Sequence, residues 1–369
     1  MTENLSRRRL MQAVGATALS ASAGAGRAIP GPRAEGKDTP KISQQVGSLA
    51  YSPGGLDEAG MRRIKQLGVD YVLTDGPRVP WEEGQLRTLI DTLKSGGLTL
   101  RHLYLNGYPN ATYGRSGRDQ EIENVIRAIR VAGKVGLPVL EYNWYAHRAA
   151  EGYYGETGRG GSGVTSFDYD RVKDLPPLPQ VGVHTAEQMW SNITYFLKAV
   201  IPEAEKAGVR LALHPNDPPA PVSRGSGQIM GTLAGWKRLI GIVNSPSNGI
   251  TFDCGVTREM GEDPVQVCRY FGSRDRINHV HFRNVTVRKP YEKYSEVFID
   301  AGEIDMFAVM KELVKQKYTH LIHPEHPRGL DYDREQPNFR SQYEGGGGYA
   351  GWAFNVAYTR ALLQAALSS

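Results

Sequence analysis

Side chains that can bind a metal ion close several short apolar segments in the second half of the sequence. Each segment looks like a strand, and each is followed by a stretch that looks like a helix. The side chains at their ends are, in chain order, His214, Asp253, His281 and Glu325. Two imidazoles and two carboxylates suit Mn²⁺, Fe²⁺, Co²⁺ or Mg²⁺ with open coordination positions better than a closed structural zinc site. We expect these four side chains to hold one divalent metal, Mn²⁺ or Fe²⁺.

Two positions of this set have a neighbour that could serve instead. Asp253 precedes Cys254, and strand alternation lets only one of them point inward; an oxygen-rich site favours Asp253. His279 and His281 share a strand face. His281 lies nearer the C-terminal end, which makes it the better ligand and leaves His279 one layer deeper.

Further polar side chains stand at the same strand ends or in the adjoining loops. We take them as candidates for substrate contacts or proton transfer: Arg283, Asn284, Arg148, Asn143 and His326. An arginine beside a metal can clamp a carboxylate through two parallel hydrogen bonds. A surface arginine would look the same in sequence, so both readings of Arg148 and Arg283 stay open.

The elements that would position these groups alternate regularly along the chain. Strand-like segments cover residues 46–51, 69–73, 98–105, 139–144, 210–214, 249–253, 278–282 and 320–323. Helix-like segments follow at residues 57–67, 82–95, 119–135, 186–207, 231–243, 263–271, 305–316 and 349–367. Such alternation predicts an α/β fold with parallel strands, and this number of units predicts a single (β/α)8 TIM barrel. In TIM barrels the active site lies at the C-terminal ends of the strands, where the polar groups fall.

Two connections are longer than usual, at residues 146–184 and 284–304. Long loops in compact domains often act as lids or line a substrate. A dinucleotide site is disfavoured, because no Gly-x-Gly-x-x-Gly fingerprint follows the first strand.

The N-terminus has the order of a targeting signal: charged, then apolar, then small residues. A twin arginine lies in Ser6–Met11, and a weakly apolar stretch follows at Ala13–Leu19. We therefore predict a twin-arginine signal peptide at residues 1–28, a linker at 29–40 and the barrel at 41–369, with export to the periplasm or outside the cell. The apolar stretch is too short to span a membrane.

Composition is that of an ordinary globular protein, with 40% hydrophobic and 22% charged residues and a net charge of +5. Much of the basic excess lies in the first 33 residues, and no basic stripe with interleaved aromatic residues points to nucleic acid. The two cysteines, Cys254 and Cys268, do not form a disulfide framework. A small molecule is the expected partner, and a homo-oligomer is left open.

Several of these motifs together resemble the mannonate dehydratase family, metal-dependent TIM barrels related to the xylose-isomerase-like barrels. The matching stretches are His214-Pro215-Asn216-Asp217-Pro218-Pro219, Ser245–Phe252, His281-Phe282-Arg283-Asn284-Val285 and Pro324-Glu325-His326. Weaker similarity covers residues 142–144 and 166–169. The resemblance spans the expected strands four to eight.

The sequence also departs from the family pattern at two ligand positions. The family has a cysteine directly after the phenylalanine of strand six, where this chain has Asp253, and an aspartate on strand eight, where it has Glu325. Acids at these positions are typical of the related sugar isomerases and epimerases. Those enzymes, however, usually carry Glu where this chain has His214.

The resemblance implies a hydro-lyase of glucuronate catabolism that removes water from a sugar acid, converting D-mannonate to 2-keto-3-deoxy-D-gluconate. It implies that Asp217 contacts the substrate. Tyr349, which falls where the family has a Gly-Tyr pair, and His326 are the acid/base candidates. Glu325 is either a ligand or a base.

Two other functions fit the same residues. A divalent-metal isomerase or epimerase would act on a neutral sugar and would need no carboxylate clamp. A non-catalytic, exported sugar-acid-binding barrel would keep the cavity without depending on metal.

Overall fold

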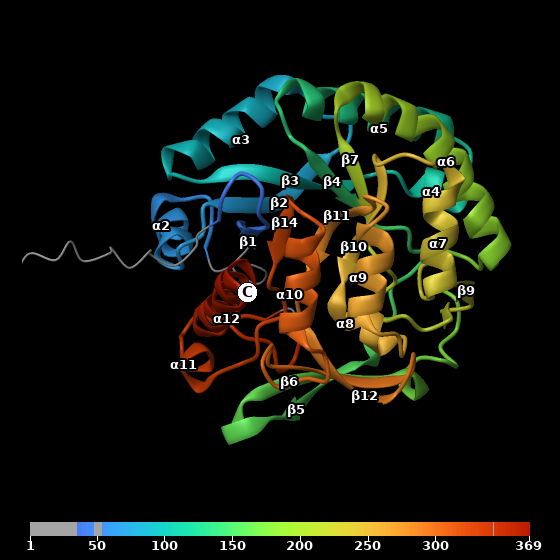
Figure 1. Cartoon of the computed structure of the whole chain (residues 1–369). Coiled ribbons are helices and arrows are strands. Elements are labelled where there is room, and N and C mark those ends of the chain that lie inside the picture. The colour runs from blue at the N-terminus through green and yellow to red at the C-terminus, as the bar shows by residue number, and fades with distance from the viewer. Residues whose placement is uncertain (1–34, 48–53, 342) are drawn as a thin grey trace, which may run out of the picture. The chain divides into compact units, whose positions relative to one another are not determined.

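Parallel strands close into a barrel with helices around it, as the alternation predicted (Figure 1). The computed structural model describes residues 35–47, 54–341 and 343–369. The barrel strands are β1 (Lys41–Gln45), β2 (Tyr71–Arg78), β3 (Thr99–Asn106), β4 (Val139–Tyr142), β7 (Arg210–Leu213), β10 (Asn248–Asp253), β11 (Ile277–His281) and β14 (Leu321–His323). They follow one another round the barrel in the order β1-β14-β11-β10-β7-β4-β3-β2. The (β/α)8 fold is confirmed.

The helices on the outside of the barrel lie close to their predicted ranges. They are α2 (Glu58–Gln66), α3 (Glu83–Ser95), α5 (Arg118–Lys134), α6 (Ala186–Ala207), α7 (Leu233–Ile242), α9 (Pro264–Gly272), α10 (Met306–Lys315) and α12 (Tyr349–Ser368). The longest, α6, shows why local sequence predicts them well. Thr185 and Gln188 form a reciprocal capping box at its start, and Gly208 ends it in the left-handed conformation.

The first strand was predicted too late in the chain. We expected it at residues 46–51, but β1 runs from Lys41 to Gln45, and residues 48–53 lie outside the described part. Its sequence, KISQQ, is mostly polar, and yet the whole strand is buried. Hydropathy missed it because this strand buries polar side chains such as Ser43 and Gln44.

Strand register brings the ends of neighbouring strands to one level. Asp253 on β10 pairs with His281 on β11, and His281 pairs with His323 on β14. Parallel strands display side chains of paired residues side by side. The register therefore gathers the C-terminal side chains of β10, β11 and β14 at one end of the barrel.

The two long connections pair with each other instead of forming separate loops. The first contains β5 (Tyr153–Thr157) and β6 (Gly163–Asp168), and the second contains β12 (Asn284–Lys289) and β13 (Lys293–Val297). These strands form a four-stranded antiparallel sheet in the order β12-β13-β6-β5. Figure 1 shows β5, β6 and β12 beside one edge of the barrel.

Shorter elements complete the described chain. They are the helices α4 (Pro109–Tyr113), α8 (Cys254–Glu259) and α11 (Asp331–Arg334), the 3-10 turns η1 (Ala150–Gly152), η2 (Arg159–Gly161) and η3 (Tyr169–Arg171), and the hairpin of β8 (Val222–Ser223) and β9 (Ser226–Gly227). None of the helices in the described ranges is long and apolar enough to cross a membrane. The predicted signal peptide and the first half of the predicted linker lie outside those ranges.

Candidate metal centre and substrate cavity

The four side chains predicted to bind a metal meet at the C-terminal end of the barrel. His214 Nε2 lies 3.2 Å from His281 Nδ1, and Glu325 Oε1 lies 3.1 Å from the same nitrogen. Asp253 Oδ2 lies 3.6 Å from His281 Nδ1 and 3.9 Å from His214 Nε2. Nitrogen and oxygen ligands bind a divalent ion at about 2.1 Å, so ligand atoms that share one ion lie roughly 3 Å apart. The donor set and its spacing fit a divalent metal.

Asp253, and not Cys254, faces the other three side chains. The Cys254 side chain is fully buried within the hydrophobic core at the start of α8. Burial raises the pKa of its thiol well above the ordinary value, which disfavours the thiolate that a metal requires.

A metal binds a neutral imidazole or an ionised carboxylate. The surroundings favour these forms for His214 and Asp253 but not for His281. Burial and the neighbouring His281 lower the pKa of His214, which keeps its imidazole neutral. Burial raises the pKa of Asp253, but Arg283 and His281 together outweigh burial and lower it overall. Burial disfavours a charged His281, but Glu325 and Glu141 raise its pKa well above the ordinary value. A cation at His281 must therefore displace a proton, and its binding should weaken as the pH falls.

Arg283 does not line the cavity, contrary to the prediction that it binds substrate. Its side chain is 2% exposed. Its Nε donates to Asp253 Oδ2 at 3.0 Å and lies 3.3 Å from Glu325 Oε1, and its Nη1 donates to Glu259 Oε1 at 2.7 Å. Arg283 thus braces the carboxylates of the metal site from behind.

Asn284 was also predicted to contact substrate, and this prediction is wrong. Its amide nitrogen donates to the backbone oxygens of Ile299 and Ile304, and its side-chain oxygen accepts from the backbone of Val285 and Ile304. The chain leaves the barrel after β11, so Asn284 secures the start of β12 and not the cavity.

Tyr349 lies away from the site, so its proposed acid/base role is wrong. It is the first residue of α12, and its hydroxyl donates to the backbone oxygen of Arg63 on α2. The family's Gly-Tyr pair suggested the acid/base role, but the start of α12 directs the Tyr349 side chain toward a neighbouring helix.

A cavity of about 480 Å³ opens beside the metal ligands, a size suited to a small organic molecule. Its lining residues are Gln45, Asp75, Tyr104, Leu105, Asn106, Glu141, Asn143, Tyr145, Arg148, His214, Asp217, His281, Glu325 and His326. Of these described residues, only Arg148 is an arginine or lysine. The predicted contacts Asn143, Arg148, Asp217 and His326 all lie in this lining.

Asp217 fixes the position of Arg148, the arginine of the cavity lining. Arg148 Nε donates to the Asp217 backbone oxygen at 2.5 Å, and Arg148 Nη2 donates to its carboxylate at 3.0 Å. Tyr153, on β5, also donates its hydroxyl to this carboxylate. Asp217 therefore acts on the cavity through Arg148, which it holds in place.

His326 lies between the metal ligands and the four-stranded sheet. Its Nδ1 lies 2.7 Å from Glu296 Oε2 on β13, and its Nε2 lies 3.5 Å from Glu325 Oε1. Burial lowers the pKa of His326, but Glu296 and Glu325 outweigh burial and raise it. The protonated imidazolium is therefore favoured, as a proton donor requires.

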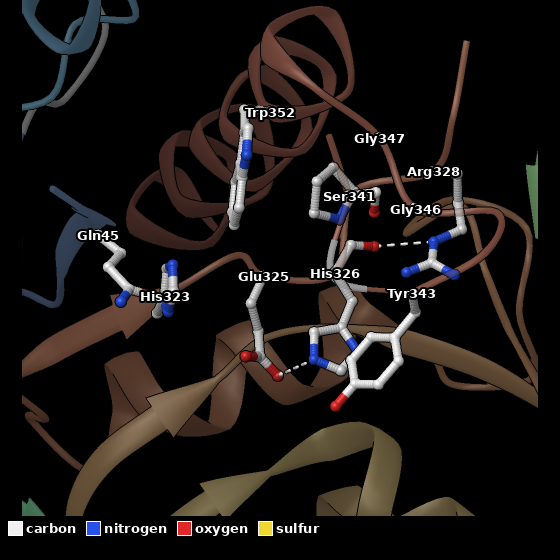
Figure 2. A pocket seen from close by; sticks show the side chains of 11 residues that line it. Gln45, His323, Glu325, His326, Arg328, Ser341, Tyr343, Gly346, Gly347 and Trp352 are labelled. Carbon is white, nitrogen blue, oxygen red and sulfur yellow. Dashed lines mark hydrogen bonds and ion pairs between the residues drawn. The ribbon is translucent and has the colours of Figure 1, made fainter. Parts of the chain in front are cut away.

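A smaller pocket of about 70 Å³ shares Gln45, Glu325 and His326 with the main cavity. Figure 2 shows Glu325 and His326 in this pocket, with the Trp352 ring beyond them. Trp352 stacks on His323 at 5.6 Å between ring centroids. Trp352 thus contributes an aromatic side chain to the lining of this pocket, which the sequence did not indicate.

Comparison with known proteins identifies the family. The sequence matches the profile of the D-mannonate dehydratase (UxuA) family over residues 180–368. A mannonate dehydratase from Streptococcus suis (strain 05ZYH33) is 30% identical over 309 residues, which are 75% of this chain and 84% of that protein. The chain belongs to the D-mannonate dehydratase family.

A second relative and a solved structure of the D-mannonate dehydratase family support this assignment. A mannonate dehydratase from Thermotoga maritima is 28% identical over 324 residues, covering 77% of this chain and 89% of that protein. The crystal structure of mannonate dehydratase from Streptococcus suis serotype 2 superposes with a TM-score of 0.77 at 26% identity, over 89% of this chain and 95% of that one. An L-ribulose 3-epimerase, with a TM-score of 0.56 at 15% identity over 89% of this chain and 96% of that one, shares the fold.

Several residues of the D-mannonate dehydratase site escaped the sequence analysis. They are Gln45, Asp75, Tyr104, Asn106, Glu141 and Tyr145, mostly at the ends of β1 to β4. A signal was available for Glu141, because a carboxylate inside the apolar run Val139–Tyr142 must be buried. The others carry no local signal that separates them from ordinary loop residues.

We predict that Arg283→Met destabilises the protein by about 3–5 kcal/mol, because it leaves buried carboxylates without their cation. Chemical denaturation would measure the change. The matched control is Arg258→Met, whose arginine pairs with Glu303 while about a third exposed, and which should cost at most about 1 kcal/mol. Equal stabilities for the two variants would show that Arg283 does not brace the site.

Proposed function

We propose that this chain is a metal-dependent hydro-lyase that converts D-mannonate to 2-keto-3-deoxy-D-gluconate. The observation that carries the proposal is the meeting of His214, Asp253, His281 and Glu325 beside a cavity whose described lining residues include a single arginine, Arg148. That combination suits a small ligand with hydroxyl groups and one carboxylate. Family membership supports the same reaction class.

The chemistry of the donor set favours Mn²⁺ or Fe²⁺, since imidazole and carboxylate ligands together suit these ions. When bound, such an ion would act as a Lewis acid that stabilises negative charge developing on the sugar acid. Glu325, with Oε1 directed toward His281, belongs to this ligand group.

The remaining groups would bind the substrate and move its protons. Dehydration removes the proton from the carbon beside the carboxylate and the hydroxyl from the next carbon. Asp75, a carboxylate of the cavity lining outside the ligand group, would accept that proton as the base. Arg148 would hold the carboxylate, and its contacts with Asp217 keep it oriented before substrate arrives. His326 would give its proton to the departing hydroxyl, which leaves as water. The enol that remains rearranges to the 2-keto acid.

A second function, isomerisation or epimerisation of a neutral sugar, is favoured by one specific observation. Carboxylates from Asp253 and Glu325 stand in the ligand group where the family pattern has cysteine and aspartate. The panel assay below separates the two reactions.

The direct test removes metal from the protein, reloads it with Mn²⁺ or Fe²⁺, and supplies D-mannonate, other aldonates and neutral sugars. We expect a 2-keto-3-deoxy acid from an aldonate, formed only after reloading. Interconversion of a neutral sugar without product from any acid would make the chain an isomerase. Acid binding without turnover under any metal would leave a binding protein.

We predict that Arg148→Met raises KM for the acid by about 10- to 100-fold, because a charge-assisted hydrogen bond contributes about 1.5–3 kcal/mol. Steady-state kinetics with parallel thermal unfolding would separate substrate binding from stability. The control is Arg159→Met, an arginine in the same long connection that is 49% exposed and pairs with Asp300. An unchanged KM would mean that Arg148 does not clamp the carboxylate.

We propose further that the protein is exported by the twin-arginine route to the periplasm or beyond, on the order of residues in 1–28. Replacing Arg7, Arg8 and Arg9 together by lysine should retain the full-length chain inside the cell, whereas Arg33→Lys should not. Cell fractionation would measure both. Retention of the wild type itself would refute export.

A further inference from the structure

A buried carboxylate of the cavity lining lies beside the metal ligand His281, and no arginine or lysine of the described residues balances its charge. Glu141 is on β4, and its side chain is 0% exposed. Among the described residues its ion-pair partners are three histidines, His102, His279 and His281. A buried carboxylate is costly unless it is paired, so this arrangement requires an explanation.

The two oxygens of Glu141 face different groups. His279 Nδ1 lies 2.8 Å from Oε2, within hydrogen-bond geometry, and His102 Nε2 lies 3.2 Å from the same oxygen. The other oxygen, Oε1, is buried without a hydrogen-bond partner in the described structure. His279 and His102 thus fix the carboxylate so that Oε1 is left for another group.

The ion-pair partner of that oxygen in the described structure is the outer nitrogen of a metal ligand, His281. Oε1 of Glu141 lies 3.7 Å from Nε2 of His281, and this nitrogen is likewise buried without a hydrogen-bond partner. A shift of about half an ångström would bring this 3.7 Å pair to the upper end of the range of an N–H···O bond, about 2.7–3.2 Å. The opposite nitrogen of His281, Nδ1, is the one that faces His214, Asp253 and Glu325.

We propose that Glu141 is a positioning residue that holds the proton of neutral His281 on Nε2 and so leaves the Nδ1 lone pair free for the metal. A carboxylate that accepts from the outer nitrogen of a histidine ligand fixes its tautomer and ring orientation and makes it a stronger ligand. His102 and His279 act one step further away, by orienting Glu141. The proposal rests on the proposed function, because it requires His281 to bind the metal.

The same cluster has a competing interpretation, which the experiment must separate. His102, Glu141 and His279 could themselves hold a second ion, because their ligand atoms lie within 4.8 Å of one another. The ring nitrogens of His102 and Nε2 of His279 are buried without a hydrogen-bond partner in the described structure, as Nε2 of His281 is, so the unpartnered atoms fit both interpretations. The hydrogen-bond geometry between His279 Nδ1 and Glu141 Oε2 favours the positioning role. Wild-type protein should therefore bind one equivalent of Mn²⁺.

The test compares the wild type with Glu141→Gln, which removes the charge at nearly equal volume, and Glu141→Met, which also removes the acceptor. Equilibrium dialysis with Mn²⁺ should give a dissociation constant about 10- to 100-fold higher for both variants. Saturating Mn²⁺ should restore much of the lost turnover. The matched control is Glu312→Gln on α10, a buried glutamate paired with Arg269, which should leave Mn²⁺ affinity unchanged.

A spectroscopic readout separates positioning from simple loss of stability. Nitrogen-15 NMR of histidine-labelled protein loaded with Zn²⁺ should show His281 protonated on Nε2 in the wild type, with that proton signal lost or shifted in Glu141→Met. His281→Gln would assign the signal.

Each contrary result has its own meaning. Wild-type protein that binds no Mn²⁺ would overturn the proposed function, and this inference with it. Wild-type protein that binds Mn²⁺, with unchanged affinity and an unchanged His281 signal in both Glu141 variants, would overturn the inference alone. Two equivalents of Mn²⁺ in the wild type, one of them lost in His102→Ala, would make the cluster a second metal site.

Discussion

The structure depends on one buried cation, the guanidinium of Arg283. It lies within ion-pair distance of Asp253, Glu259, Glu325 and Asp217, which are carboxylates that repel one another at the end of the barrel. Removing such charges from water costs several kcal/mol each unless they are paired. By joining these groups, Arg283 allows two oxygen ligands to remain ionised beside two imidazoles before any metal binds. An arginine that looked like a substrate contact in sequence is therefore a structural part of the metal centre.

On the inner side of the metal centre, the charge of a carboxylate is balanced by imidazoles and not by a guanidinium group. Glu141 is paired only with histidines among the described residues. Burial raises the pKa of Glu141, but the neighbouring imidazoles of His281, His102 and His279 together bring it well below the ordinary value. The side of the ligand group that faces Arg283 is thus held by a permanent charge. Its inner side is held by groups whose protons can be rearranged when a metal binds.

The small sheet of β5, β6, β12 and β13 supplies the second support of the cavity. Tyr153 on β5 holds the carboxylate of Asp217, which orients Arg148, and Glu296 on β13 holds His326. These contacts join residues far apart in the chain through strand pairing outside the barrel. The groups expected to bind the carboxylate and to move a proton are therefore ordered by the two long connections, while the metal ligands are ordered by the barrel itself.

The sequence by itself determined the barrel and the convergence of His214, Asp253, His281 and Glu325. Hydrophobic periodicity and helix caps are local signals, and parallel strands bring their C-terminal ends together whatever the details of packing. Only the tertiary structure decided which polar groups face the cavity. Asn284 and Tyr349 turn away from it because the chain leaves the barrel after β11 and begins α12 at Tyr349, and Arg283 is captured by carboxylates from other elements. Glu141 gained its place through histidines on β3 and β11, contacts that depend on the register of a closed barrel and leave no trace in the local sequence.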